Sequence, residues 1–136
     1  MTTTKPPIWF WIVSVLALVW NGMGVKAYLD QAYNTETYRA MYSEEQIEIA
    51  ANLPSYITAA FAIAVFGGIL GSILLLLRKK LATVVFYLSL LAVVVQMGYL
   101  LINDYASSIG MTVMIIAFAL FLAWFAKFSA SKGYIS

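Results

Sequence analysis

The chain consists of four long apolar stretches separated by short polar segments. The apolar stretches cover residues 8–29, 56–77, 81–102 and 109–128. Each is about as long as the roughly 20 helical residues that cross a bilayer core about 30 Å thick. None shows the alternation of apolar and polar positions that marks a membrane barrel strand, so their backbone groups must pair within helices. The pattern predicts an all-α fold, an integral membrane antiparallel four-helix bundle that forms one domain over residues 1–136.

Residues 30–54, between the first two spans, form the only sizeable segment outside the predicted membrane. Thr35 is a suitable helix N-cap, and Ser43 with Gln46 has the form of a capping box. Apolar and acidic residues recur here at near-helical spacing, which predicts one or two short amphipathic helices on the outer membrane surface. Two roles fit this loop: a connector whose apolar face rests on the bundle, or a lid over an outward vestibule.

The composition excludes an ordinary water-soluble domain and several classes of active site. Hydrophobic residues make up 63% of the chain and charged residues 10%, whereas soluble domains are about half apolar and a quarter charged. The chain has no cysteine and no histidine, which excludes disulfides, thiol nucleophiles, histidine-ligated haem and ordinary zinc sites. No acidic residue lies within a span, and no phosphate-binding or dinucleotide motif is present. We therefore expect no enzyme activity, no cofactor, no metal and no nucleic-acid partner.

The few charged residues are distributed unevenly between the two ends of the predicted bundle. Six of the eight basic residues lie in the two termini and the connection between the second and third spans: Lys5, Arg78, Lys79, Lys80, Lys127 and Lys132. All six acidic residues lie in the other two loops: Asp30, Glu36, Glu44, Glu45, Glu48 and Asp104. Because cytoplasmic loops are enriched in Lys and Arg, the charges predict a multi-pass protein of a bacterial inner membrane with both termini in the cytoplasm.

Two amide side chains lie inside the predicted spans at similar depth. Asn21 is about 13 residues and Gln96 about 15 residues from the inner start of its span, which corresponds to roughly 20 and 22 Å of helical rise. Tyr28 and Tyr99 lie at or above that level. The commoner use of such amides is hydrogen bonding between helices, worth about 0.6 kcal/mol each. The alternative is an outward-open pocket, formed by these four residues, that binds a small neutral solute with hydroxyl or amide groups.

The second span carries a run of small residues that is typical of close helix packing. Gly67 comes four residues before Gly71, and Gly68 comes four residues before Ser72. Small residues at this spacing let two helix backbones approach closely. We expect a neighbouring helix of the same chain, rather than a second copy, to pack on this face.

The ends of the predicted spans carry residues typical of membrane interfaces. Lys26 and Asp30 are four residues apart at the outer end of the first span, which predicts an ion pair with the lysine reaching toward water. Aromatic residues at the inner ends of the first and fourth spans predict a belt at the lipid head groups: Trp9, Phe10, Trp11, Trp124, Phe125 and Phe128.

Several short strings along the chain carry a family resemblance. They are Pro6-Pro7-Ile8-Trp9-Phe10-Trp11, Trp20-Asn21-Gly22-Met23-Gly24, Ala59 to Gly68, Arg78-Lys79-Lys80, Gln96-Met97-Gly98-Tyr99, Trp124-Phe125-Ala126-Lys127 and Lys132-Gly133-Tyr134. Through them the chain, apart from residues 30–54, resembles a family of small bacterial four-span membrane proteins that sometimes carry the label "sugar transporter". The resemblance implies a transport role and carries over no catalytic or binding residue.

Two functions follow from these features as hypotheses. The first is a facilitator of a small neutral solute such as a sugar, with Asn21 and Gln96 lining the vestibule. Four helices are few for a transporter built from two repeats, so this hypothesis predicts a homodimer or a larger assembly. The second is a non-transporting accessory or scaffold subunit that binds lipid or a larger membrane complex through its spans.

Overall fold

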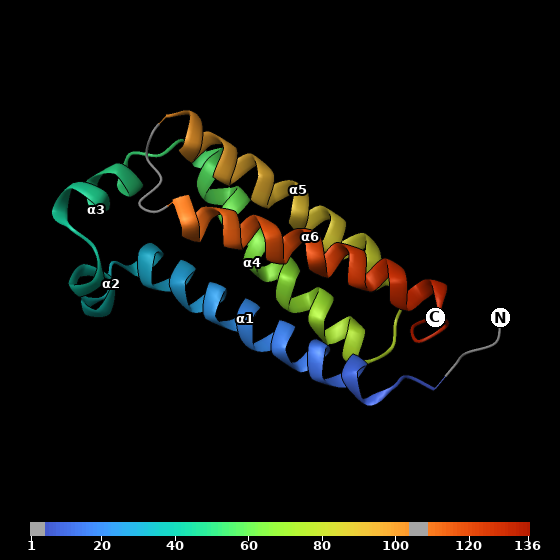
Figure 1. Cartoon of the computed structure of the whole chain (residues 1–136). Coiled ribbons are helices and arrows are strands. Elements are labelled where there is room, and N and C mark those ends of the chain that lie inside the picture. The colour runs from blue at the N-terminus through green and yellow to red at the C-terminus, as the bar shows by residue number, and fades with distance from the viewer. Residues whose placement is uncertain (1–4, 104–108) are drawn as a thin grey trace.

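The computed structural model describes residues 5–103 and 109–136, which form six helices and no strand (Figure 1). The helices are α1 (Ile8–Tyr33), α2 (Glu36–Met41), α3 (Glu44–Ala51), α4 (Ser55–Leu76), α5 (Leu81–Ile102) and α6 (Ile109–Ser131). Four of them, α1, α4, α5 and α6, are long and apolar enough to cross a membrane. The all-α prediction is confirmed, and the chain is a multi-pass membrane protein.

The short helices between α1 and α4 begin where the sequence signals predict. The Thr35 hydroxyl accepts a hydrogen bond from the Tyr38 backbone N–H (3.2 Å) and so caps α2. Ser43 and Gln46 form the predicted capping box of α3, with reciprocal hydrogen bonds of 3.0 and 3.2 Å. The helical character predicted for this loop is confirmed. Residues 104–108, which include the acidic residue predicted for the other loop, lie outside the described residues.

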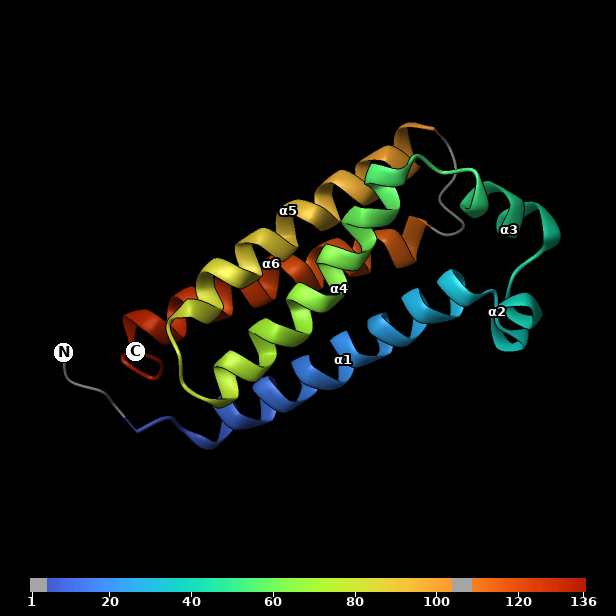
Figure 2. The same ribbon diagram turned by 180° about the vertical axis from the view of Figure 1, so that it is seen from behind.

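The four long helices form an antiparallel bundle in which α4 lies between α1 and α5, and α5 packs against α6 (Figure 1 and Figure 2). α1 reaches Tyr33, past the predicted end at residue 29. We call residues 34–54 the cap, and the neighbouring end of the bundle the cap end. The opposite end, the tail end, holds the start of α1, the α4–α5 turn and the C-terminus (Figure 1).

The tail half of the bundle is filled by side chains from all four long helices. Phe10 of α1, Phe86 of α5 and Phe125 of α6 are at most 2% exposed and pack together with apolar residues of α4. The prediction that Phe10 and Phe125 lie at the lipid head groups is therefore wrong. Successive helix positions point in different directions, so these two rings face the core, while the neighbouring Trp9 and Trp124 are 44% and 57% exposed.

The cap half of the bundle has a second core that leaves α1 out. Its buried members come from α4 and α5, with side chains of α6 packed against them: Ala60, Ala64, Ala92, Val93 and Met97. No residue of α1 belongs to this cluster among those the structure describes. In this half, α1 packs mainly against α4 among the long helices that the structure describes, and the space on its other side holds the site described below.

The last residues of the chain fold back onto the α4–α5 turn, which the sequence did not predict. Gly133 follows α6 at φ 78°, a left-handed conformation that glycine adopts without strain. The Ser136 N–H donates to the carbonyl of Arg78 (3.1 Å), and Arg78 Nε donates to the carbonyl of Tyr134 (2.8 Å). Ile135 between them is fully buried. The contact closes the tail end of the bundle.

Candidate functional site

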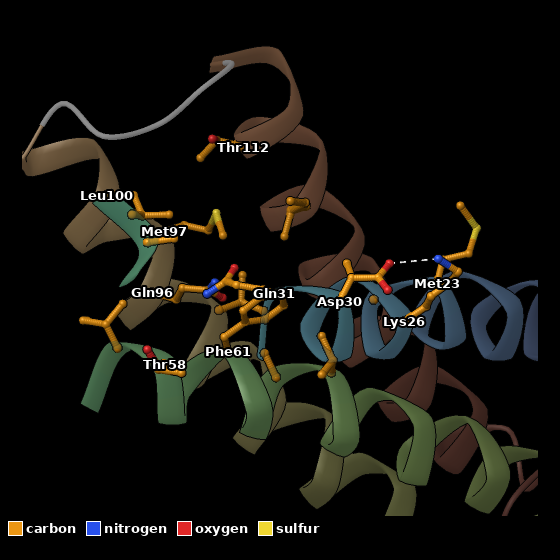
Figure 3. Close-up of a pocket in the computed structure, with 18 of the residues that line it drawn as sticks. Met23, Lys26, Asp30, Gln31, Thr58, Phe61, Gln96, Met97, Leu100 and Thr112 are labelled. Atoms are coloured by element: carbon orange, nitrogen blue, oxygen red, sulfur yellow. Dashed lines mark hydrogen bonds and ion pairs between the residues drawn. The ribbon is translucent and has the colours of Figure 1, made fainter. Parts of the chain in front are cut away.

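A cavity of about 600 Å³, here called the main cavity, lies in the cap half of the bundle (Figure 3). It is bounded by α1 on one side and by α4, α5 and α6 on the other, with residues of α2 and α3 over it. Most of its wall is apolar and includes Phe61, Val93, Met97, Ile115 and Leu122. Ligand pockets measure about 300–1,000 Å³ and combine apolar walls with a few polar groups. The main cavity therefore has the size and composition of a binding site.

Packed side chains close the main cavity toward the tail end. Trp20 of α1 stacks on Phe118 of α6 with ring centroids 4.5 Å apart, so the two helices are in contact at this level. Phe86 and Leu122 belong both to the cavity wall and to the tail-half core. The cavity thus ends about halfway along the bundle.

The main cavity opens along one side of α1, at a position we call the mouth. Met23, Lys26 and Ala27 line the cavity and are nevertheless exposed, Met23 to 62%. Met23 and Ala27 lie on the same face of α1 as Trp20, because residues three or four apart share a side of a helix. The Trp20–Phe118 contact shows that this face is directed toward α6. The mouth therefore lies beside α6.

An ion pair is positioned at the mouth. Lys26 Nζ lies 2.8 Å from Asp30 Oδ2, which confirms the pair predicted from their spacing. Asp30 Oδ1 also accepts a hydrogen bond from the Thr35 hydroxyl (3.0 Å). The two bonds orient the carboxylate and connect the end of α1 to the start of the cap. Because the Lys26 side chain is 67% exposed, the pair adds little to stability, about 0–1 kcal/mol for a surface salt bridge.

Gln96 places an amide group in the wall contributed by α5. The residue is 9% exposed, and its side chain points into the main cavity (Figure 3). Within residues 5–103 and 109–136, the Gln96 amide makes no hydrogen bond. This amide is therefore available to a molecule that occupies the cavity.

Asn21 lies at the closed end of the same cavity. Its Nδ2 donates to the Ala17 carbonyl (2.8 Å) and lies 3.5 Å from Ser72 Oγ, which itself donates to the Gly68 carbonyl (2.8 Å). A Cβ added at Gly68 would overlap Oδ1 of Asn21 and lie 3.2 Å from its Nδ2. The sequence predicts a similar depth in the membrane for Asn21 and Gln96. In the structure both line the main cavity, and they do not hydrogen-bond to each other.

The other small residues of α4 lie against α5. A Cβ added at Gly71 would lie 2.9 Å from the ring of Phe86, and one added at Gly67 would lie 3.4 Å from Cβ of Ser89. The Ser89 hydroxyl donates to the carbonyl of Ala64 across the same contact (2.7 Å). The run of small residues thus serves contacts with both α1 and α5 of this chain.

The two tyrosines expected beside the amides are not part of the main cavity wall. Tyr28 packs edge-on against Phe61 and Phe66 of α4, with ring centroids 5.3 and 5.8 Å apart. The ring of Tyr99 lies 6.2 Å from that of Tyr56. Tyr28 lies on the side of α1 that faces α4, whereas the main cavity lies on the side that faces α6.

A second cavity of about 370 Å³, here called the cap cavity, lies beneath the cap. Its lining residues are Tyr28, Gln31, Ala32, Asn34, Tyr38, Ile47, Ala50, Ala51 and Thr58. Tyr38 is 7% exposed, and burial, together with the nearby Tyr42, raises the pKa of its phenol. Its hydroxyl therefore remains protonated near neutral pH.

Sequence reasoning missed Gln31 and Tyr38 as lining residues. Gln31 follows Ala27 by four positions and so shares its face of α1, a signal that helical periodicity contains. Tyr38 reaches the cavity only because α2 folds back over the bundle, which no local pattern predicts.

No protein-family model, curated protein or solved structure matches this chain. Among the residues that the structure describes, no three acidic side chains lie close enough together to hold a metal ion. The site itself combines an apolar cavity with a lateral mouth, an amide in its wall that has no partner in the described part of the chain, and a smaller polar cavity next to it.

Proposed function

We propose that this protein binds a lipid-like amphiphile whose hydrocarbon chain enters the main cavity through the mouth. The observation that carries the proposal is a mainly apolar cavity of about 600 Å³ that opens on the side of a membrane-spanning helix. An empty apolar space forfeits the dispersion contacts of the side chains around it. A chain from the bilayer supplies these contacts without passing through water, which favours a lipid-like occupant over a free solute.

The proposed location is a bacterial inner membrane, with both termini in the cytoplasm. The support is the charge distribution, since Arg78, Lys79 and Lys80 lie at the tail end and the cap is rich in glutamate. Basic residues favour the cytoplasmic side of a membrane. In this orientation both cavities lie in the outer half of the bilayer, so the amphiphile comes from the outer leaflet.

A facilitator of a neutral solute such as a sugar is the second candidate, because Asn21 and Gln96 line the same cavity. The rings of Phe10, Phe86 and Phe125 fill the tail half, so a solute could cross only after these rings separate. Flux of radiolabelled sugars into proteoliposomes tests this candidate. Flux that is abolished by Asn21→Leu would favour the facilitator over an amphiphile-binding protein.

A cavity-filling substitution tests amphiphile binding directly. Ala119 of α6 lines the main cavity, whereas Ala117 is exposed on another side of the same helix. In native mass spectra of protein released from bacterial lipid nanodiscs, we expect the wild type and Ala117→Trp to retain one amphiphile per chain. Ala119→Trp fills the cavity and should lose the retained molecule. Equal retention by the two variants would contradict the proposal.

A further inference from the structure

The main cavity and the cap cavity adjoin each other. Gln31, Tyr38, Ala50 and Thr58 line both, so they form a shared wall between the two spaces. The main cavity is mainly apolar and has its mouth on the side of α1, whereas the cap cavity lies under the cap, at the cap end of the bundle. A molecule with an apolar chain and a polar head would fit both spaces at once, with its chain in the main cavity and its head in the cap cavity.

The cap cavity is lined by hydrogen-bonding groups that have no partner within the protein. Its polar side chains are two phenols, two amides and one aliphatic hydroxyl: Tyr28, Gln31, Asn34, Tyr38 and Thr58. In the part of the chain that the structure describes, none of these side-chain groups forms a hydrogen bond. Each of these groups can donate and accept hydrogen bonds, so the cavity suits a molecule that carries both hydrogen-bond donors and acceptors.

Among the residues that the structure describes, none that lines the cap cavity is charged. The glutamates of the cap, Glu36, Glu44, Glu45 and Glu48, are exposed on its surface. Lys26 and Asp30 line the main cavity and are already paired with each other. A charged head group in the cap cavity would lose its hydration without gaining a counter-ion, which is costly, whereas a neutral head group would only exchange hydrogen bonds.

We infer that the cap cavity holds the head group of the amphiphile whose chain occupies the main cavity, and that this head group is uncharged and carries hydroxyl or amide groups. The inference rests on the proposed function, because it needs a chain in the main cavity. A monoacylglycerol, with one chain and a small diol head, is the simplest molecule with this chemistry.

A competition between amphiphiles with the same oleoyl chain tests the inference. The full-length protein in nanodiscs is offered equal amounts of monooleoylglycerol, oleoyl lysophosphatidylcholine and oleate, and the retained molecules are counted by native mass spectrometry. We expect monooleoylglycerol to be retained at least about 10-fold over either charged competitor, which corresponds to one or two neutral hydrogen bonds. Free glycerol, added alone and in excess, should neither bind nor displace it.

Isosteric substitutions show whether the cap cavity provides the preference. Tyr38→Phe and Thr58→Val each remove one hydroxyl and should each reduce the preference for monooleoylglycerol by about 2- to 10-fold, with total amphiphile retention unchanged. Tyr33→Phe is the matched control, because Tyr33 is 78% exposed and lies outside the cap cavity lining. It should change nothing.

The possible failures are distinguishable. Equal retention of all three amphiphiles, or a preference that Tyr38→Phe and Thr58→Val leave unchanged, would overturn the head-group inference while chain binding stands. Displacement of monooleoylglycerol by free glycerol would also overturn it, since the site would then serve a free polyol. If the wild type retains no amphiphile at all, the proposed function itself, amphiphile binding in the main cavity, is wrong.

Discussion

Gly68→Ala probes the contact between α1 and α4 that forms the closed end of the main cavity. The added Cβ would overlap Oδ1 of Asn21 and lie 2.5 Å from its Cγ and 3.2 Å from its Nδ2. Asn21 cannot turn away freely, because its Nδ2 donates to the Ala17 carbonyl (2.8 Å). The substitution must therefore either break that bond or push α1 away from α4.

The expected cost follows from three terms. Inserting a methyl group into a packed contact costs about 1–3 kcal/mol. Loss of the Asn21 side-chain hydrogen bond adds about 0.5–1.5 kcal/mol. Alanine in place of a helical glycine stabilises the helix by about 0.5–1 kcal/mol, which offsets part of this loss. The sum is a net destabilisation of about 0.5–4 kcal/mol, which for a chain of this size lowers the melting temperature by about 2–14 °C.

Thermal unfolding of the purified protein in one detergent, followed by circular dichroism, measures this effect against two comparisons. Gly98→Ala is the matched control, because no described atom outside the adjoining backbone of α5 and the two neighbouring residues lies within 4 Å of a Cβ added at Gly98. It should leave the melting temperature unchanged or raise it. Asn21→Ala combined with Gly68→Ala should recover most of the loss, with a coupling energy of about 0.5–3 kcal/mol. A Gly68→Ala protein as stable as Gly98→Ala would refute the packing of α4 against α1 described here.

Three further outcomes follow from the structure. Gln96→Leu should leave the melting temperature unchanged or raise it, since no hydrogen bond within the described protein is lost; a clear decrease in the same assay would contradict the unpaired amide. Ile135→Ala should destabilise the protein by about 2–5 kcal/mol, because Ile135 is fully buried, whereas Ser136→Ala should have little effect. Burial raises the pKa of Tyr38, so its contribution to stability is complete below the ordinary value of 10.0 and is lost as pH rises through the folded value. The melting temperature should therefore fall more steeply above about pH 10 in the wild type than in Tyr38→Phe, and parallel pH curves would contradict this.

The long helices could be predicted from the sequence because membrane thickness fixes the length of an apolar span. The similar depth of Asn21 and Gln96 followed from helical rise alone, and both line one cavity in the structure. The cavity itself could not be predicted. Hydropathy is nearly uniform around each span, so it does not indicate that α1 is excluded from the core formed by Ala64 and Met97 in the cap half.

Contacts between segments distant in the sequence were also beyond prediction. Phe10 and Phe125 have the composition of an interfacial belt, and only the packing of four helices at the tail end shows that their rings are buried. The docking of Ile135 depends on a left-handed Gly133 and on Arg78, which itself has φ 57°. A non-glycine residue in that conformation is uncommon, and nothing in the local sequence around Arg78 requires it.

Fluorescence of Trp20 reports whether an amphiphile chain occupies the main cavity, because the indole of Trp20 lines this cavity. The experiment uses two single-tryptophan proteins, one that retains Trp20 and one that retains the exposed Trp124. Each is reconstituted with increasing amounts of a monoacylglycerol whose chain carries bromine, a short-range quencher of tryptophan fluorescence. If an amphiphile chain occupies the main cavity, quenching of Trp20 saturates at a mole fraction where quenching of Trp124 is still small and proportional to the amount added. If both tryptophans follow the same proportional curve, no chain binds in the main cavity and the proposed function is wrong.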